Sequence, residues 1–418
     1  MRLPILNLAL RSIANRRATA ILTVLTVAIS VMLFLGVEKV RHGARASFEN
    51  TISGVELIVG ARSSPVNLLL YSVFHIGDAT NNITWESYEA VANAPGVAWT
   101  VPISLGDSHR GHRVIGTTPG YFEHYQYGGG RSLNFAEGVP FDDLFDAVIG
   151  AAVARELGYV VGEEIVVAHG MGAVGFIEHD NNPFTVTGIL APTGTPLDRS
   201  VLVSLEAIEA IHMGGATGAG ATVSADELRA MDLSPDQITA FFVGLDSPVA
   251  ALRLQRAINT YPEEPLQAVI PGVALAQLWS VVGAAERTLA AVAAFVVLTG
   301  LVSILTAILT SLNERRREMA ILRALGARPH HVFLLLVAEA ALVALAGAVL
   351  GAGATYGALH LLAPLLEARF GILLPGLTPG LYDLGIIAAV TGAAAVLGAF
   401  PAWRAYRNSL ADGMTIRL

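Results

Sequence analysis

Four long stretches without a charged side chain constrain this chain more than any other feature. An α-helix needs about 20 residues to cross a hydrocarbon layer of about 30 Å, and backbone groups in lipid must form hydrogen bonds within their own segment. Each stretch is therefore predicted to be a membrane-spanning helix. Only 14% of the 418 residues are charged, against about 25% in soluble domains, which also favours an integral membrane protein. The stretches occupy residues 18–37, 288–312, 340–366 and 384–403.

Basic side chains gather beside the ends of these stretches. Of the 26 lysines and arginines, 12 lie in residues 1–17, 313–331 and 404–418. Because short loops rich in Lys and Arg stay in the cytoplasm, all three segments are predicted to be cytoplasmic. Residues 38–283 then lie outside, and their 12 basic and 27 acidic side chains make this block strongly acidic. Nucleic-acid binding is not expected, because the large domain has no basic patch.

The predicted fold class is an α-helical membrane protein with four transmembrane helices and a large α+β extracytoplasmic domain inserted between spans one and two. The predicted parts are a cytoplasmic amphipathic helix at 1–17, transmembrane helices at 18–37, 284–312, 332–366 and 381–403, an extracytoplasmic domain with stalk helices at 38–283, a cytoplasmic coupling helix at 313–331, a short outer loop at 367–380 and a cytoplasmic tail at 404–418.

A cleaved signal peptide is the alternative for the first stretch. Its 20 uncharged residues exceed the roughly 7–15 apolar residues of a signal peptide, which favours an uncleaved helix. The chain has no cysteine, so the outer domain is predicted to be held by packing, without disulfides.

The outer block alternates short strand and helix patterns. Runs rich in β-branched residues and bounded by Gly, Pro or Asp predict strands, and Thr84 is a candidate helix cap. The glycine-rich stretch after His212 is predicted to be a surface loop. Strands are expected at residues 55–59, 97–103, 112–116, 147–149, 164–168 and 184–190, and helices at 84–94, 151–157, 205–211 and 248–259.

The segment between the second and third spans is the most specific signal. Glu314 and Glu318 lie one helical turn apart with arginines between them, Ile321 and Leu325 continue an apolar strip, and Gly326 is placed to end the helix. One interpretation is a lever on which a cytoplasmic partner acts. The other is a turn that its arginines anchor at the membrane face. Spacing alone leaves both open.

The third span carries small residues at helical spacing and one carboxylate. Gly347 and Gly351 form one G-x-x-x-G pair, and Gly353 and Gly357 form another. Small residues four apart let helices approach closely, so these glycines are predicted to pack against span four or another subunit. Glu339 is an intramembrane carboxylate and therefore a candidate functional group. It is predicted to reach the cytoplasmic surface or to pair with a loop arginine.

Two further groups of side chains in the outer block, one of histidines and one of aspartates, are candidate metal-binding or catalytic sites. A His-x-x-His pair on one helical turn can bind zinc, but this stretch predicts a turn and a strand, so a metal site is not favoured. Clustered aspartates can perform paired-carboxylate chemistry, but no His or Ser partner follows at a recognisable spacing, so a solvated acidic turn is favoured. The residues are His109, His112 and His124 for the first group, and Asp142, Asp143 and Asp146 for the second.

The segment after span two resembles the coupling segment of FtsX/MacB-type ABC transporter permeases. The family pattern is close to R-x-x-E-[IM]-[AG]-[IL]-L-[RK]-A-[LI]-G-A, and residues 315–327 match it. The arginine-rich entry to span one at residues 8–17 and the Pro-Ala-Trp-Arg-Ala exit at residues 401–405 resemble the family as well. Several segments between residues 94 and 190 resemble its periplasmic core domain, whereas the glycine-rich stretch after His212 departs from the pattern and leaves substrate contacts there open.

The resemblance implies a permease that works with a separate ATP-binding subunit. Two copies of an ABC ATPase would dock at the coupling helix and bind ATP and Mg, and a second permease copy would complete a homodimer or heterodimer in a bacterial cytoplasmic membrane. ATP-driven movement of the spans would be passed to the outer domain, a mechanism called mechanotransmission. The residues implied in coupling are Glu314, Arg315, Glu318, Ile321, Leu322, Arg323, Leu325 and Gly326.

The sequence is consistent with an energy source in another subunit. It contains no G-x-x-x-x-G-K-[ST] phosphate-binding loop, so no ATPase activity and no cofactor are expected in this chain. A periplasmic adaptor or substrate-binding protein and membrane lipids are further expected partners. Two other functions stay open: a membrane regulator that activates a cell-wall hydrolase, and an ion-driven carrier that uses Glu339. The substrate and the direction of transport are not determined by the sequence.

Overall fold

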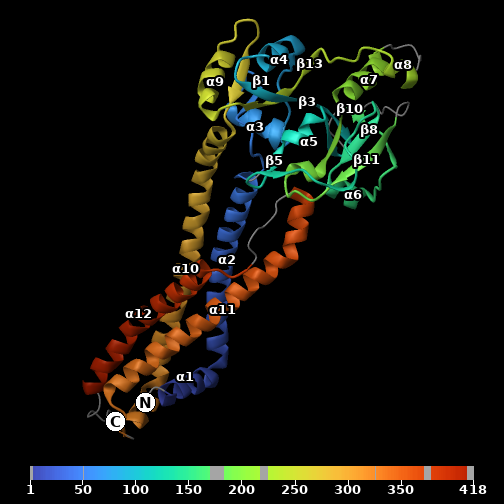
Figure 1. The fold of residues 1–418 in the computed structure, drawn as a ribbon. Coiled ribbons are helices and arrows are strands. Elements are labelled where there is room, and N and C mark those ends of the chain that lie inside the picture. The colour runs from blue at the N-terminus through green and yellow to red at the C-terminus, as the bar shows by residue number, and fades with distance from the viewer. Residues whose placement is uncertain are drawn as a thin grey trace. The chain divides into compact units, whose positions relative to one another are not determined.

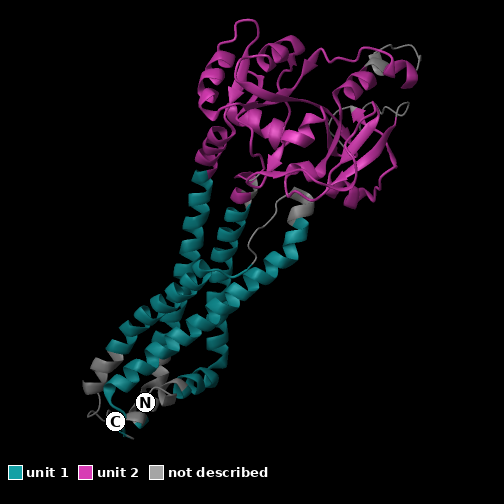
Figure 2. Cartoon of the chain, viewed as in Figure 1, with its two compact units in different colours: residues 1–43, 283–365, 374–418 teal, residues 44–282, 366–373 magenta. Residues whose placement is uncertain are grey.

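The computed structural model describes residues 3–49, 51–169, 183–216, 225–324, 326–370 and 378–411. The chain forms two compact units (Figure 2). The helical unit comprises residues 1–43, 283–365 and 374–418, and the α/β unit comprises residues 44–282 and 366–373.

The helical unit is built from long helices, four of which are long and apolar enough to cross a membrane. The larger segment of the α/β unit, residues 44–282, lies in the sequence between the first and second of these four (Figure 1). This organisation confirms the predicted fold class. The helices are α1 (Leu3–Asn15), α2 (Arg17–Glu49), α10 (Pro271–Ala324), α11 (Pro329–Phe370) and α12 (Leu381–Ala411).

The core of the helical unit is made of small and branched side chains. On α11, alanines recur at every fourth position and form one buried stripe. α11 is also the most enclosed span. In its most apolar 18-residue segment, 39% is buried within the protein, against 22% to 28% in the other three spans. The buried members of this core are Val27, Val31 and Leu35 on α2, Ile304 and Ile308 on α10, Ala340, Ala344, Ala348 and Ala352 on α11, and Val390 and Ala394 on α12.

The α/β unit is organised around a mixed sheet. Its strand order is β15-β1-β14-β3-β4-β12-β8-β11-β7, with β10 also paired to β3 and β9 to β11. The β4–β12 and β8–β11 pairs are parallel, and the other pairs are antiparallel. The strands of this sheet are β1 (Leu57–Ala61), β3 (Val97–His109), β4 (His112–Thr117), β7 (Phe135–Gly138), β8 (Asp146–Ile149), β9 (Glu164–Ile165), β10 (Ala168–His169), β11 (Phe184–Leu190), β12 (Ser200–Ser204), β14 (Ala240–Leu245) and β15 (Leu266–Val269).

Short helices and two small sheets complete this unit. Thr84 caps α4 as predicted, because its Oγ1 accepts the Ser87 N–H. The small sheets are β2 (Ile83–Thr84) with β13 (Gln237–Ile238) and β5 (Gln126–Tyr127) with β6 (Arg131–Ser132). The helices are α3 (Pro65–Val73), α4 (Trp85–Ala92), α5 (Gly120–His124), α6 (Ala151–Leu157), α7 (Leu205–Ala216), α8 (Ala225–Arg229) and α9 (Ala251–Asn259), with 3₁₀ turns at Pro196–Arg199 and Pro248–Ala250.

Both faces of the sheet are buried near its β1–β14 pair. Ile58 and Phe242 belong to one hydrophobic cluster, whereas Leu57 and Phe241, one position away, belong to another. Successive side chains of a strand point to opposite faces, so apolar layers cover the two sides. A third cluster covers the β8–β11–β12 region.

Candidate functional site

The predicted coupling segment is the end of a helix that begins far earlier in the chain. α10 continues without a break to Ala324, because residues 313–324 are strong helix formers without Gly or Pro. Gly326 has φ +93°, a left-handed conformation that glycine adopts without strain. Pro329 then opens α11, and the Arg328 N–H donates to His331 Nδ1 at 3.1 Å. The turn between the two helices is therefore short and locally closed.

The structure places most of the predicted coupling residues on this last part of α10. The positions from Glu314 to Arg323 are helical, and the Ile321 side chain is 55% exposed. The backbone alone is described at Glu314, Arg315, Glu318, Leu322 and Arg323, and Leu325 lies outside the described residues. Contact between these residues and a partner stays a prediction. An exposed isoleucine beside a helix end is a feature that a partner protein can bind.

The start of α11 is fixed against the end of α12. Val332 and Leu336 are buried with Ala402 in a small hydrophobic cluster. Gly398 permits this approach, because a Cβ added there would lie 2.7 Å from Ala340 Cβ. The turn after α10 is thus attached to a packed pair of helices.

The glycines of α11 divide into two pairs with different surroundings. A Cβ on Gly347 would lie 2.7 Å from Val27 Cβ, and a Cβ on Gly351 would collide with the Ala28 carbonyl oxygen. These two glycines therefore bring α11 against α2 rather than against span four. Gly353 and Gly357 have no described atom within 4 Å of such a Cβ.

Hydroxyl groups reinforce the contacts of α2 with its neighbours. Ser30 Oγ shares its proton between the Thr26 carbonyl of its own helix, at 2.8 Å, and the Val296 carbonyl of α10, at 3.0 Å. Thr355 Oγ1 of α11 likewise lies 2.9 Å from its own Gly351 carbonyl and 3.3 Å from the Met32 carbonyl of α2. Hydrogen bonds of this kind are a common link between membrane helices. Neither residue is among those that the sequence predicts to matter for helix packing. The available signal was a Ser or Thr within an otherwise apolar span.

Glu339 is half-buried on α11. It lies on the same helix face as Leu336 and Val332, which are one and two turns away, respectively. Its predicted role at the cytoplasmic surface stays a prediction.

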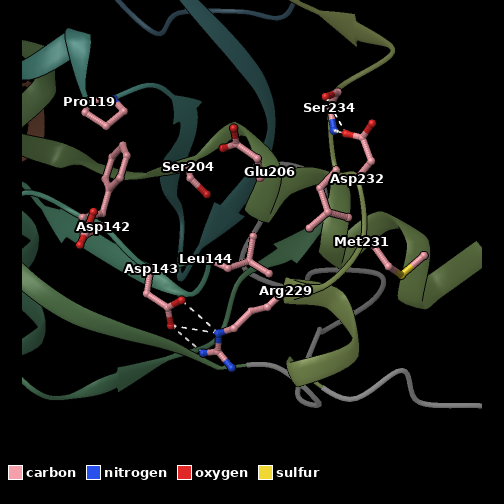
Figure 3. Close-up of a pocket in the computed structure, with 12 residues that line it drawn as sticks. Pro119, Asp142, Asp143, Leu144, Ser204, Glu206, Arg229, Met231, Asp232 and Ser234 are labelled. Carbon is pink, nitrogen blue, oxygen red and sulfur yellow. Dashed lines mark hydrogen bonds and ion pairs between the residues drawn. The ribbon is translucent and has the colours of Figure 1, made fainter.

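The α/β unit contains an open cavity of about 620 Å³ (Figure 3). Arg229 forms a bidentate contact with Asp143, with an Nη2–Oδ2 distance of 2.6 Å, and this contact holds the pKa of Asp143 below its ordinary value. Phe141 and Leu233 form buried parts of the wall. The lining residues are Pro119, Phe141, Asp142, Asp143, Leu144, Ser204, Glu206, Arg229, Met231, Asp232, Leu233 and Ser234.

Several polar side chains that line or adjoin this cavity form local hydrogen bonds within turns and at a helix end. Asp146 Oδ2 accepts the N–H groups of Asp142 and Asp143 and closes the acidic turn. Ser204 Oγ accepts the Ala207 N–H and caps α7. Ser234 Oγ donates to Asp232. Among the described side chains that line the cavity, no histidine lies beside a serine.

The three candidate metal-ligand histidines have other partners, although His109 and His112 face each other across the β3–β4 pair. His109 Nδ1 lies 2.6 Å from the Val166 carbonyl, and its Nε2 lies 2.9 Å from Tyr159 Oη. His124 stacks on Trp99 with ring centroids 4.4 Å apart. Within the described ranges, no three His, Asp or Glu side chains form a metal-binding group. Burial lowers the pKa of His109 and of His112.

Comparison with protein families gives two matches that together cover most of the chain. Residues 20–261 match the MacB-like periplasmic core domain, and residues 290–410 match the FtsX-like permease C-terminal region. The predicted coupling segment lies within the second match.

A curated relative and several solved structures resemble the chain. The macrolide export ATP-binding/permease protein MacB of Azoarcus sp. (strain BH72) is 24% identical over 356 residues, which are 84% of this chain and 51% of that protein. The chain thus spans about half the length of this relative. The periplasmic region of MacB from Actinobacillus actinomycetemcomitans is 10% identical, with a TM-score of 0.33, over 55% of this chain and 94% of that one. The extracellular domain of the noncanonic ABC-type transporter YknZ from Gram-positive bacteria is 14% identical, with a TM-score of 0.30, over 51% and 98%.

Proposed function

Because this chain belongs to the ABC transporter permease family that has a MacB-like periplasmic core domain, we propose that it is the permease subunit of an ABC transporter complex whose ATPase is a separate subunit. The observation that carries the proposal is the order of the two family matches along the chain, with the coupling motif of residues 315–327 inside the second. Two ATPase copies, which hold ATP and Mg, dock at the end of α10, and a second permease copy completes the complex.

Charge supports the proposed orientation. The arginine-rich ends of the spans face the cytoplasm with both termini, and the acidic α/β unit faces the periplasm or the extracellular space. The complex lies in a bacterial cytoplasmic membrane. Apolar side chains of α10 such as Phe295 and Val302 are exposed in the single chain, as expected for a surface that meets lipid or the second permease copy.

Helix continuity supports mechanotransmission. α2 and α10 have no internal proline, so their hydrogen-bond ladders are not interrupted in the way that proline interrupts a helix. Each of these helices begins in one unit and ends in the other. In the proposed cycle, ATP binding by the partner moves the end of α10, and this movement reaches the α/β unit through the helix. The work done there is export or extraction of a substrate at the outer face.

Purification of the full chain from its native membrane in mild detergent tests this function. We expect an ABC ATPase subunit to co-purify and to hydrolyse ATP. Glu318→Lys and Arg323→Glu place the opposite charge within the motif and should reduce the recovered ATPase subunit. Glu137→Lys, an exposed change on β7, is the matched control and should leave recovery unchanged.

The same preparation separates the alternatives. An ion-driven carrier works without an ATPase, and a hydrolase regulator retains a cell-wall hydrolase. Wild-type recovery of the ATPase subunit with both motif variants would contradict docking at the end of α10.

A further inference from the structure

Three polar side chains from three helices of the helical unit meet near the first turn of α12. Lys39 Nζ of α2 lies 3.1 Å from Asp383 Oδ2 of α12, and Tyr356 Oη of α11 donates to the same oxygen at 2.6 Å. The Gly380 N–H is its third donor, at 2.7 Å. Lys39 Nζ also lies 5.5 Å from the centre of the Tyr356 ring. We name Lys39, Tyr356 and Asp383 the polar clasp.

The two carboxylate oxygens of Asp383 differ in their hydrogen-bond partners. Oδ2 has three donors, whereas Oδ1 is buried and has no hydrogen-bond partner among the described residues. Capping of α12 explains only the bond from Gly380. A carboxylate that is 1% exposed and lacks partners on one oxygen is incompletely satisfied, and buried networks of this kind are unfavourable when partly satisfied. Among the described residues, all three donors to this carboxylate are thus concentrated on Oδ2.

Lys39 is the only lysine in the 418 residues, whose other 25 basic side chains are all arginine. The two side chains bind carboxylates differently. The planar arginine fork binds both oxygens at once, whereas a lysine ammonium is a point charge on a flexible stem. An arginine at position 39 could supply a donor to Oδ1. The lysine at this position contacts only one oxygen of Asp383, Oδ2.

Asp383 and Lys39 differ in the number of contacts that hold them and in their exposure to solvent. Asp383 is bound by Gly380, which directly precedes α12, and by Tyr356 of α11, so it stays with these two helices. Lys39 is the only contribution from α2, and its side chain is 25% exposed while that of Asp383 is 2% exposed. Lys39 is thus the member that can move into solvent, after which Asp383 keeps the neutral donors of Tyr356 and Gly380 but loses its counter-charge.

We propose that Lys39 and Asp383 are positioning residues of a releasable clasp, which holds α2 to α11 and α12 in one state and opens when ATP-driven movement displaces α2. This inference rests on the proposed function for its energy source. The pairing itself is a property of the chain alone. For α2 to move against the rest of the helical unit, the contact between Lys39 and Asp383 must break and then form again.

The single lysine makes the clasp directly measurable. An amine-reactive N-hydroxysuccinimide ester modifies only Lys39 and the terminal amine, and mass spectrometry of proteolytic fragments separates the two sites. In the purified full chain without nucleotide, we expect slow labelling of Lys39. Asp383→Asn retains the side-chain shape but removes the charge, and it should raise the labelling rate several-fold. Glu49→Gln, an exposed acidic residue on the same helix, is the matched control. An unchanged rate in Asp383→Asn would overturn the pairing; if that variant does not fold, Asp383→Ser, which also removes the charge, replaces it with the same expected result.

The release is tested in the complex with its ATPase. A non-hydrolysable ATP analogue should raise Lys39 labelling several-fold, and Lys39→Arg should raise the melting temperature while lowering ATP-coupled turnover. Equal labelling with and without the analogue, together with normal turnover in Lys39→Arg, would show a static clasp and overturn the proposal. If no ATPase subunit is found, the proposed function and the ATP-driven release both fail, while the Asp383→Asn experiment still decides whether the pair exists.

Discussion

The two units of this molecule build their cores from opposite kinds of side chain. The helical unit places alanine and glycine where α11 meets its neighbours. The α/β unit fills its interior with large residues, among them Tyr71, Phe184 and Phe242, each fully buried. Lipid tails are as apolar as the helices, so membrane helices gain by close approach rather than by burial from water. The α/β unit is held instead by the apolar area that it removes from water.

The largest expected effect is a truncation in the aromatic core. Phe242 lies on β14 between Ile58 of β1 and Val101 of β3. Phe242→Ala should lower the free energy of unfolding of the α/β unit by about 3–5 kcal/mol, through lost burial and the cavity left behind. Urea unfolding of the full chain in detergent, followed by tryptophan fluorescence, measures it. Leu252→Ala, at a 69% exposed position, should change little; equal losses in the two variants would contradict the assigned core.

The helical unit should respond to the opposite kind of change, an added methyl group. In Gly351→Ala the new Cβ meets the Ala28 carbonyl, so α2 must move, at a cost of about 1–3 kcal/mol. Gly353→Ala adds the same group where no described atom lies within 4 Å, and it should be neutral or slightly stabilising because alanine favours helix. Melting temperatures in detergent compare the pair. Equal shifts in both variants would show that α11 does not approach α2 as described.

Acid should weaken the α/β unit through His75. Burial and the neighbouring Arg113 lower the pKa of His75 to about 3, and its Nδ1 lies 3.1 Å from Ser200 Oγ. Between about pH 6.5 and pH 3 the unfolded chain binds a proton at this histidine that the folded chain does not, so stability falls as pH falls.

Other histidines also contribute to the pH dependence. His109 and His112 act in the same direction as His75, and His212, whose pKa is raised beside Asp107, acts in the opposite one. His75→Asn should flatten the decline in melting temperature between pH 7.5 and pH 5, and an unchanged slope would argue against this assignment.

The smallest expected effect is at the cavity ion pair. Arg229 and Asp143 are 40% and 51% exposed, and solvent screens such exposed pairs, so they contribute little to stability. Arg229→Gln should therefore leave the urea midpoint of unfolding almost unchanged. A loss as large as that of Phe242→Ala would show that the pair supports the α/β unit as its apolar core does.

Local signals predicted much of the fold. β11 and α6 fall on the predicted residues, because each is a short pattern bounded by Gly or Pro. β12, β14 and β15 were missed. All six residues of β14 are buried, so it lacks the alternation that identifies a half-buried strand. The expected separate coupling helix is continuous with α10, since no residue between positions 313 and 324 ends a helix.

Contacts between distant segments could not be read from the sequence. The G-x-x-x-G spacing indicated close packing of the third span, but nothing local identifies α2 as the partner of Gly347 and Gly351. The same limit hid the polar clasp, whose members belong to three helices. Its one local signal was a single lysine among arginines, beside the end of the first apolar stretch. Spacing describes one element well, while the choice of partner depends on the whole packed bundle.

The sidedness of the turn after α10 tests the central claim most directly, and the cysteine-free chain permits a clean measurement. Ile321→Cys and Leu252→Cys introduce one exposed thiol each, and spheroplasts are treated with a membrane-impermeant maleimide. We predict that Leu252→Cys reacts in intact spheroplasts, whereas Ile321→Cys reacts only after lysis and is protected by the bound ATPase subunit. Reaction of Ile321→Cys from outside intact spheroplasts would contradict the account.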